Sequence, residues 1–135
     1  MLVYSYREDT PRHTAFLAWM EEAINSPQPY AVSEMVLGSF LRIVTHPRVF
    51  KRRSELESAL SFAQMVRDQP NAVVVAPGPR HWQLFVHICK RADARGNLIP
   101  DAYLAALAID TASDLITTDR DFARFPGLRW RHPLD

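Results

Sequence analysis

The chain has 135 residues, a length that suits one domain with a single core, and we expect one domain over residues 1–135. Hydrophobic residues make up 47% and charged residues 23%, which excludes a disordered chain, and the formal net charge of +1 does not by itself indicate a polyanionic partner. No apolar run approaches the roughly 20 residues of a membrane-spanning helix and no signal-peptide pattern is present, so we expect a cytoplasmic protein.

The first third of the chain predicts a strand followed by two helices. Residues 2–6 are β-branched and aromatic enough for a strand, which begins at the first residue and therefore looks cut short. Thr10-Pro11 is an N-cap signal for a helix that ends near Asn25, because prolines follow at 27 and 29. A second helix is expected over residues 33–45, with a broad apolar stripe of Val36, Leu37, Phe40, Leu41 and Val44.

The middle of the chain predicts a third helix and a buried strand. A basic loop over residues 48–53 precedes Ser54 and Glu57, which have the spacing of a capping box for a helix to about Asp68. The continuous apolar run at 72–76 is typical of a parallel strand that is covered on both faces.

The last third predicts helices over residues 80–94 and 101–111 and a strand over 114–118. A helical turn at 121–125 and an edge strand at 128–131 complete the chain. This alternating order predicts the α/β class, packed as a three-layer α/β/α domain with a mainly parallel central sheet whose first strand is truncated.

Acidic residues lie where the strands of such a sheet end and helices begin. Asp119 follows a strand directly, with Asp121 two residues later, and Asp101 opens a helix after a proline. Helix capping is an ordinary alternative for Asp101 and Asp121. Glu34 shares a helical face with Leu37 and Leu41, so we expect its carboxylate to lean toward the core.

Other chemistries have little support in the sequence. Cys89 is the only cysteine, which excludes an internal disulfide and a thiolate metal cluster, and no two histidines have the spacing of a shared helical face. Converging carboxylates repel one another, and a divalent ion such as magnesium or manganese relieves that cost. The reaction that fits is metal-assisted hydrolysis of a phosphodiester.

Arginine supplies fourteen of the sixteen basic residues, and its guanidinium fork matches phosphate geometry. A genome rich in arginine codons explains the same count equally well. The candidates for phosphate contacts lie in the basic loop and after the last acidic motif: Arg48, Arg52, Arg53, Arg120 and Arg124.

Four segments stand in an order and spacing that closely resemble a known family. They are residues 2–9 (LVYSYRED), Ser33-Glu34 with 41–50 (LRIVTHPRVF), 100–108 (PDAYLAALA) and 117–122 (TTDRDF). The family is that of the VapC toxins, PIN-domain ribonucleases of bacterial type II toxin–antitoxin pairs, and the likeness covers nearly the whole chain.

The resemblance implies a site of Glu34, Asp101 and Asp119 that holds Mg²⁺ or Mn²⁺, with Asp121 as an auxiliary acid. It implies a structured RNA substrate, transfer or ribosomal, a cognate VapB-type antitoxin, and a homodimer or a toxin–antitoxin hetero-oligomer. It also implies that the second and third helices clamp the antitoxin, so that Val36, Phe40 and Val44 belong to that interface; burial in the core is the competing interpretation.

One family feature has no counterpart. Family members carry an aspartate, any residue and an asparagine shortly before the segment that stands here as Leu2-Val3-Tyr4, and Glu8 and Asp9 lie too far along the strand, roughly 20 Å, to replace that acid. Either the genuine protein is longer or the toxin is natively truncated. We therefore expect this chain to bind metal weakly and to cleave RNA poorly.

Two rival functions remain to be separated. A catalytically impaired domain would bind antitoxin or RNA without cleaving it. A signalling receiver domain also gathers acids around magnesium, but it needs a lysine after a late strand, and the only lysines are Lys51 and Lys90.

Overall fold

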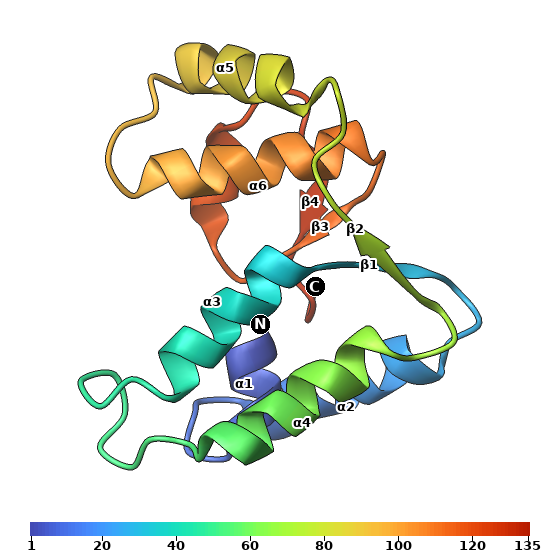
Figure 1. Cartoon of the computed structure of the whole chain (residues 1–135), viewed down its shortest axis with the longest axis vertical. Coiled ribbons are helices and arrows are strands. Elements are labelled where there is room, and N and C mark those ends of the chain that lie inside the picture. The colour runs from blue at the N-terminus through green and yellow to red at the C-terminus, as the bar shows by residue number, and fades with distance from the viewer. The chain divides into compact units, whose positions relative to one another are not determined.

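The chain forms two compact units, residues 1–75 and 76–133, with Leu134 grouped with the first unit and Asp135 with the second. The structure is a computed structural model that describes all residues, 1–135 (Figure 1). Each unit has its own cluster of buried hydrophobic side chains. The longest helices have 13 residues, and no helix is long and apolar enough to cross a membrane.

The first unit contains four helices and one pair of parallel strands. The strands β1 (Tyr30–Ser33) and β2 (Ala72–Val75) pair with Tyr30 opposite Ala72. The helices are α1 (Leu2–Tyr6), α2 (His13–Asn25), α3 (Glu34–Val44) and α4 (Leu56–Arg67).

Helix α3 supplies the centre of the first core. Phe40 and Val44 are 2% and 0% exposed, and Leu37 is buried beside them. The ring of Phe40 packs against Tyr6 of α1 and Phe62 of α4, with centroids 5.4 and 5.3 Å away. The predicted helix over residues 33–45 is therefore confirmed to within a residue at each end, and its stripe packs into the core of this unit.

The strand predicted at residues 2–6 is wrong, because this segment forms helix α1. A strand must share its backbone hydrogen bonds with a neighbour, whereas these residues satisfy theirs locally, from Ser5 N to Met1 O and from Arg7 N to Val3 O. The buried hydroxyl of Ser5 also donates to Phe16 O of α2, at 3.1 Å. Helix α1 thus packs on α2 and α3 instead of joining a sheet.

The second unit is built around α6 (Leu98–Asp110), which lies between α5 (His81–Ala92) and the short strands in Figure 1. Ala102, Ala105 and Ala106 are fully buried, and their small side chains let Ile88 of α5 approach closely. The strands β3 (Leu115–Ile116) and β4 (Trp130–Arg131) pair in parallel, with the 3₁₀ helix η1 (Arg120–Arg124) between them in the chain. The α/β class with parallel pairing is confirmed, and the four strands form two pairs, one in each unit.

Several predicted local details differ from the structure. Helix α2 begins three residues after Thr10, whose hydroxyl donates to Arg7 O. Ser54 is not the N-cap of α4, a position held by Glu55, and its hydroxyl accepts from Arg7 instead. Strand β2 is not covered on both faces, since Val73 and Val74 are 50% and 41% exposed.

Candidate active site

The acids after β3 are held in a defined turn. Asp119 follows Thr117-Thr118, and its carboxylate accepts a hydrogen bond of 2.8 Å from Asp121 N, which caps η1. Asp119 N in turn donates to the Thr117 hydroxyl at 3.1 Å. Both carboxylates are exposed, so this turn presents two negative charges to solvent from a fixed backbone.

Asp101 lies beside these two acids. It occupies the first turn of α6, which begins three residues earlier than predicted, and it is partly buried without a hydrogen bond or an ion pair. Desolvation by burial raises the pKa of Asp101, and the negative charges of Asp119 and Asp121 raise it further. Asp101 therefore does not cap α6 through a hydrogen bond, and the structure brings these three acids within electrostatic range of one another.

The chemistry of these donors fits a hard divalent cation. Carboxylate oxygens are the ligands that Mg²⁺ and Mn²⁺ prefer, and an unpartnered, partly desolvated acid beside two others is stabilised by a cation. The positions of these acids do not yet form a metal site, because no group of three or more His, Cys, Asp or Glu side chains is arranged to hold a metal ion. The acids are thus neighbours but are not gathered into a finished metal centre.

Glu34 is in the other unit, at the start of α3. The expectation that its carboxylate leans toward the core is wrong, because the side chain is 68% exposed. It accepts a hydrogen bond of 3.2 Å from Arg67 Nε at the end of α4, and Arg67 also pairs with Asp68 at 3.3 Å. A guanidinium within reach lets the carboxylate turn to the surface rather than pack on the apolar stripe.

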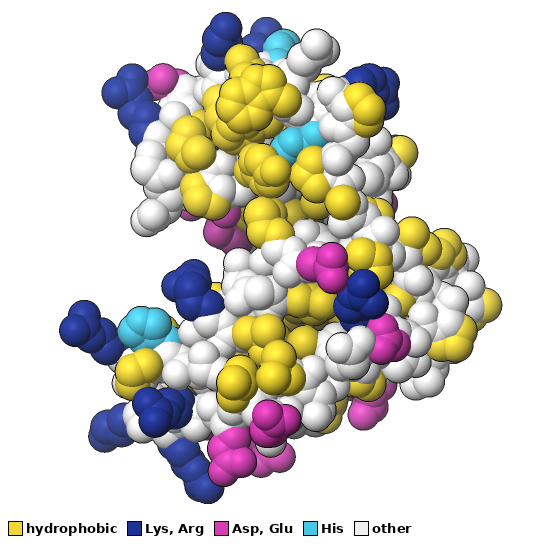
Figure 2. Space-filling model, viewed as in Figure 1, with side chains coloured by type: hydrophobic (Ala, Val, Ile, Leu, Met, Phe, Trp, Pro, Cys, Tyr) yellow, Lys and Arg dark blue, Asp and Glu magenta, His cyan; other side chains and the backbone are white.

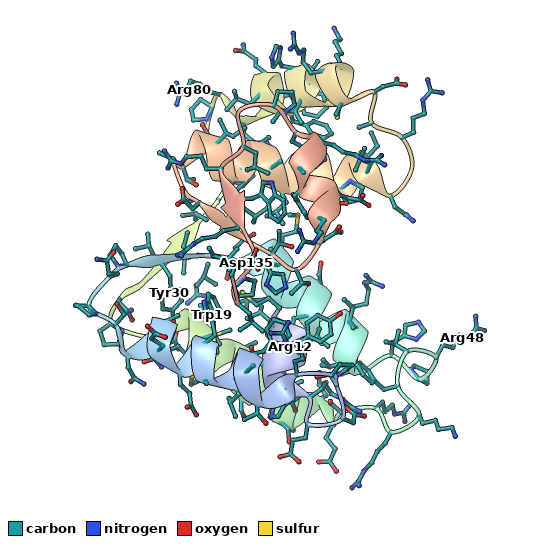
Figure 3. The ribbon with its side chains drawn as sticks, turned by 180° about the vertical axis from the view of Figure 1, so that it is seen from behind. Arg12, Trp19, Tyr30, Arg48, Arg80 and Asp135 are labelled. Atoms are coloured by element: carbon teal, nitrogen blue, oxygen red, sulfur yellow. The ribbon has the colours of Figure 1, made fainter.

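The five arginines predicted to contact RNA fall into two groups. Arg124 lies 3.8 Å from an Asp121 carboxylate oxygen, so its charge is partly committed to the acidic turn. The other four are exposed and form no ion pair: Arg48, Arg52, Arg53 and Arg120. Figure 3 shows Arg48 extending away from its loop.

Some charged residues were missed because no sequence signal marks their partners. Arg67 gave no signal as the partner of Glu34, which lies 33 residues away in the chain. Asp110 ends α6 with a side chain only 9% exposed, and it accepts a hydrogen bond from Gly78 N at 3.0 Å. Arg80, labelled in Figure 3, lies 3.8 Å from the same carboxylate. These contacts join the loop before α5 to the end of α6.

Comparison with known proteins gives consistent matches over the length of the chain. The PIN domain family matches residues 1–128. Ribonuclease VapC43 of Mycobacterium tuberculosis is 38% identical over 135 residues, which are 100% of this chain and 92% of that protein. Ribonuclease VapC25 of the same organism is 38% identical over 133 residues, 98% of this chain and 94% of the relative.

A solved structure supports the fold. The crystal structure of VapBC2 from Rickettsia felis, bound to a DNA fragment from the promoter, contains a chain that matches with a TM-score of 0.67. The match covers 97% of this chain and 92% of that chain, at 18% sequence identity. At that identity the match speaks for the fold alone.

Proposed function

The chain belongs to the PIN-domain family and, within it, to the VapC ribonucleases, and we propose that it cleaves structured RNA, transfer or ribosomal, as the toxin of a toxin–antitoxin pair. The observation that carries the site assignment is Asp101, a partly buried acid that has no partner and whose pKa is raised by desolvation and further by the charges of Asp119 and Asp121. Such an arrangement is costly without a cation and is typical of functional sites.

We assign the acids separate roles. Asp101 and Asp119 would hold Mg²⁺ or Mn²⁺ together with Glu34, and Asp121 would assist from the turn that Asp119 caps. When bound, a divalent cation lowers the pKa of a water and neutralises charge that develops on the phosphodiester. The family resemblance alone assigns Glu34 to this set, and its exposed ion pair with Arg67 is worth about 1 kcal/mol or less, so it binds Glu34 only weakly.

The proposed partners follow from the family. The Rickettsia felis structure is a VapBC complex, and we propose that this chain binds a VapB-type antitoxin. We also propose that it assembles either as a homodimer or as a toxin–antitoxin hetero-oligomer. A toxin that cleaves transfer or ribosomal RNA has its substrate in the cytoplasm, and we propose that this protein acts there. We also propose that the two units act as one domain, because the family match over residues 1–128 spans both.

A cleavage assay on structured transfer RNA tests this function. Because one family aspartate has no counterpart in this chain, we expect slow cleavage with Mn²⁺ or Mg²⁺. We expect no cleavage with a chelator and a further loss of roughly a hundredfold in Asp101→Asn and Asp119→Asn. The matched control is Asp93→Asn, which removes an acid that is 82% exposed at the end of α5 and should leave the rate unchanged. A chain that binds a VapB-type antitoxin yet cleaves no RNA with any divalent cation would instead support the binding-only function.

A further inference from the structure

The loop between α3 and α4, residues 45–54, carries a concentration of positive charge that no acid balances. Its four cations, Arg48, Lys51, Arg52 and Arg53, are all exposed, and none forms an ion pair. No acidic residue occurs in the sequence between Glu34 and Glu55. Figure 2 shows the dark blue side chains gathered where this loop projects from the helices.

The loop has a defined backbone. Its base is closed by a hydrogen bond of 2.8 Å from Ser54 N to Val44 O, the last residue of α3. A turn over residues 46–50 is closed by His46, whose carbonyl accepts hydrogen bonds from Val49 N and Phe50 N at 3.2 and 3.4 Å. The His46 ring accepts a further hydrogen bond from Arg48 N at 3.0 Å. These local bonds bring the ends of the loop together and tighten its turn.

A fifth cation, Arg7 at the end of α1, lies beneath the loop instead of on its surface. Its side chain is only 10% exposed, and the guanidinium carbon lies 4.0 Å from the centre of the Phe50 ring. Arg7 Nη1 donates to the Ser54 hydroxyl at 3.0 Å. Phe50 and Ser54 flank Lys51-Arg52-Arg53 in the chain, so one guanidinium holds both ends of that basic triplet.

Asp9 fixes the guanidinium in this position. Arg7 Nε donates to an Asp9 carboxylate oxygen at 2.8 Å, and Nη2 donates to the other oxygen. These hydrogen bonds lower the pKa of Asp9, so the pair stays ionised. The charge of Arg7 is therefore already balanced, and its effect on a ligand must act through the loop.

We propose that the α3–α4 loop is a preformed contact for the phosphate backbone of RNA, and that Arg7 is the positioning residue that orders it. This inference takes RNA as the substrate class from the proposed function. An ordered set of unpaired cations favours a polyanion, because arginine forks match phosphate and less conformational entropy is lost on binding. Val49 is the only large hydrophobic side chain exposed in the loop, so the loop offers little of the apolar surface that a protein partner buries.

Equilibrium binding of a fluorescein-labelled RNA hairpin to the full chain, without divalent metal, tests the contact independently of cleavage. Arg52→Gln with Arg53→Gln should weaken binding about fivefold per cation at low salt, and should reduce the slope of log K against log salt by about 1.4 to 1.8. The control pair, Arg91→Gln with Arg95→Gln, removes the same charge from exposed positions in the other unit and should retain the parent slope.

Two outcomes of this binding experiment would overturn the proposal. One is a loop variant whose salt slope equals that of the parent. The other is unchanged RNA binding with loss of affinity for a fluorescein-labelled polyglutamate peptide, which would assign the loop to an acidic protein segment. A chain that fails to cleave RNA but shows the expected slopes would refute only the proposed activity.

The role of Arg7 needs a variant that keeps the charge. Arg7→Lys removes the flat fork, and Phe50→Leu removes the ring while all four loop cations remain. Each should weaken RNA binding about fivefold, and the double variant should be no weaker than either alone, because both changes release the same loop. Arg12→Lys, at an exposed position before α2, is the control and should bind like the parent.

Trypsin provides a readout of loop order that affinity does not give. Cleavage after Lys51, Arg52 and Arg53 should be slow in the parent and several-fold faster in Arg7→Lys and Phe50→Leu, while the other exposed arginines are cut at parent rates. Parent-like cleavage in the loop together with parent-like RNA binding in both variants would show that Arg7 does not position the loop.

Discussion

Replacing Asp101 by asparagine separates two effects of a metal ligand on the free energy of unfolding: its unpaired charge lowers this energy without metal, and its bond to the metal raises it when metal is present. The change keeps the shape of the side chain and removes a partly desolvated charge that has no partner and lies near Asp119 and Asp121. Without metal, loss of that repulsion should stabilise the chain. Because the site is largely open to solvent, which screens charges, the gain should be about 0.5 kcal/mol, or about 2 °C in Tm.

Added metal should reverse the order of the two proteins. At a Mn²⁺ concentration ten times the Kd of the parent, binding to the folded chain adds about 1.4 kcal/mol, or about 5 °C. If asparagine weakens the affinity tenfold, the same concentration adds only about 0.4 kcal/mol to the variant. Thermal unfolding followed by circular dichroism, with and without Mn²⁺, measures both shifts.

The control for this experiment is Asp93→Asn, because Asp93 is 82% exposed and pairs with Arg95. It should leave the shift caused by Mn²⁺ unchanged. If Asp101→Asn showed the full metal shift of the parent, Asp101 would not be a ligand. If Asp101→Asn were less stable than the parent without metal, the reasoning about uncompensated charge would be refuted.

Three further predictions follow from individual residues. Because the pKa of Asp101 is raised, the folded chain keeps a proton at a pH where the unfolded chain has released it. The free energy of unfolding without metal should therefore fall as pH rises from the ordinary carboxyl pKa through the raised value. Urea unfolding across that pH range should show this fall, and Asp119→Asn should make it smaller. Ile88→Ala leaves a cavity at a side chain that is 1% exposed, and should lower the free energy of unfolding by about 3 kcal/mol; a loss under 1 kcal/mol would mean that α5 repacks on α6. Partial burial raises the pKa of Cys89, so the native thiol should react with Ellman's reagent more slowly than the thiol of the urea-unfolded chain, and equal rates would contradict that burial.

Much of the fold follows from local patterns. The apolar stripe of α3 and the prolines after α2 place the ends of these helices to within a residue or two, since periodicity and proline geometry act over a few positions. Strand β1 was not predicted, because its four residues carry no clear strand pattern of their own. The turn that carries Asp119 and Asp121 was also predicted from local order, because a short turn after a strand can be recognised in sequence. The resemblance to the VapC family added the grouping of distant acids, which periodicity does not show.

The predictions that were wrong concern which groups a residue contacts or hydrogen-bonds in the folded chain. Residues 2–6 have strand propensity, yet they form α1, because a strand requires a neighbour and a helix does not. Ser54 was expected to cap α4, but its hydroxyl accepts from Arg7, which lies 47 residues away. Glu34 was expected against the core, but Arg67 holds it at the surface. The last two errors concern side chains whose partners are remote in the sequence.

The sequence by itself determined the α/β class and the positions of most helices, and it supplied the acids Asp101, Asp119 and Asp121 as candidates for the site. Tertiary structure decided which charges are neutralised and which remain unpaired. Asp101 is left without a partner, Arg7 is enclosed by Phe50, Ser54 and Asp9, and the loop cations stay free. The physical reason is that propensity and periodicity act within a few residues, whereas desolvation and ion pairing depend on groups that only folding brings together.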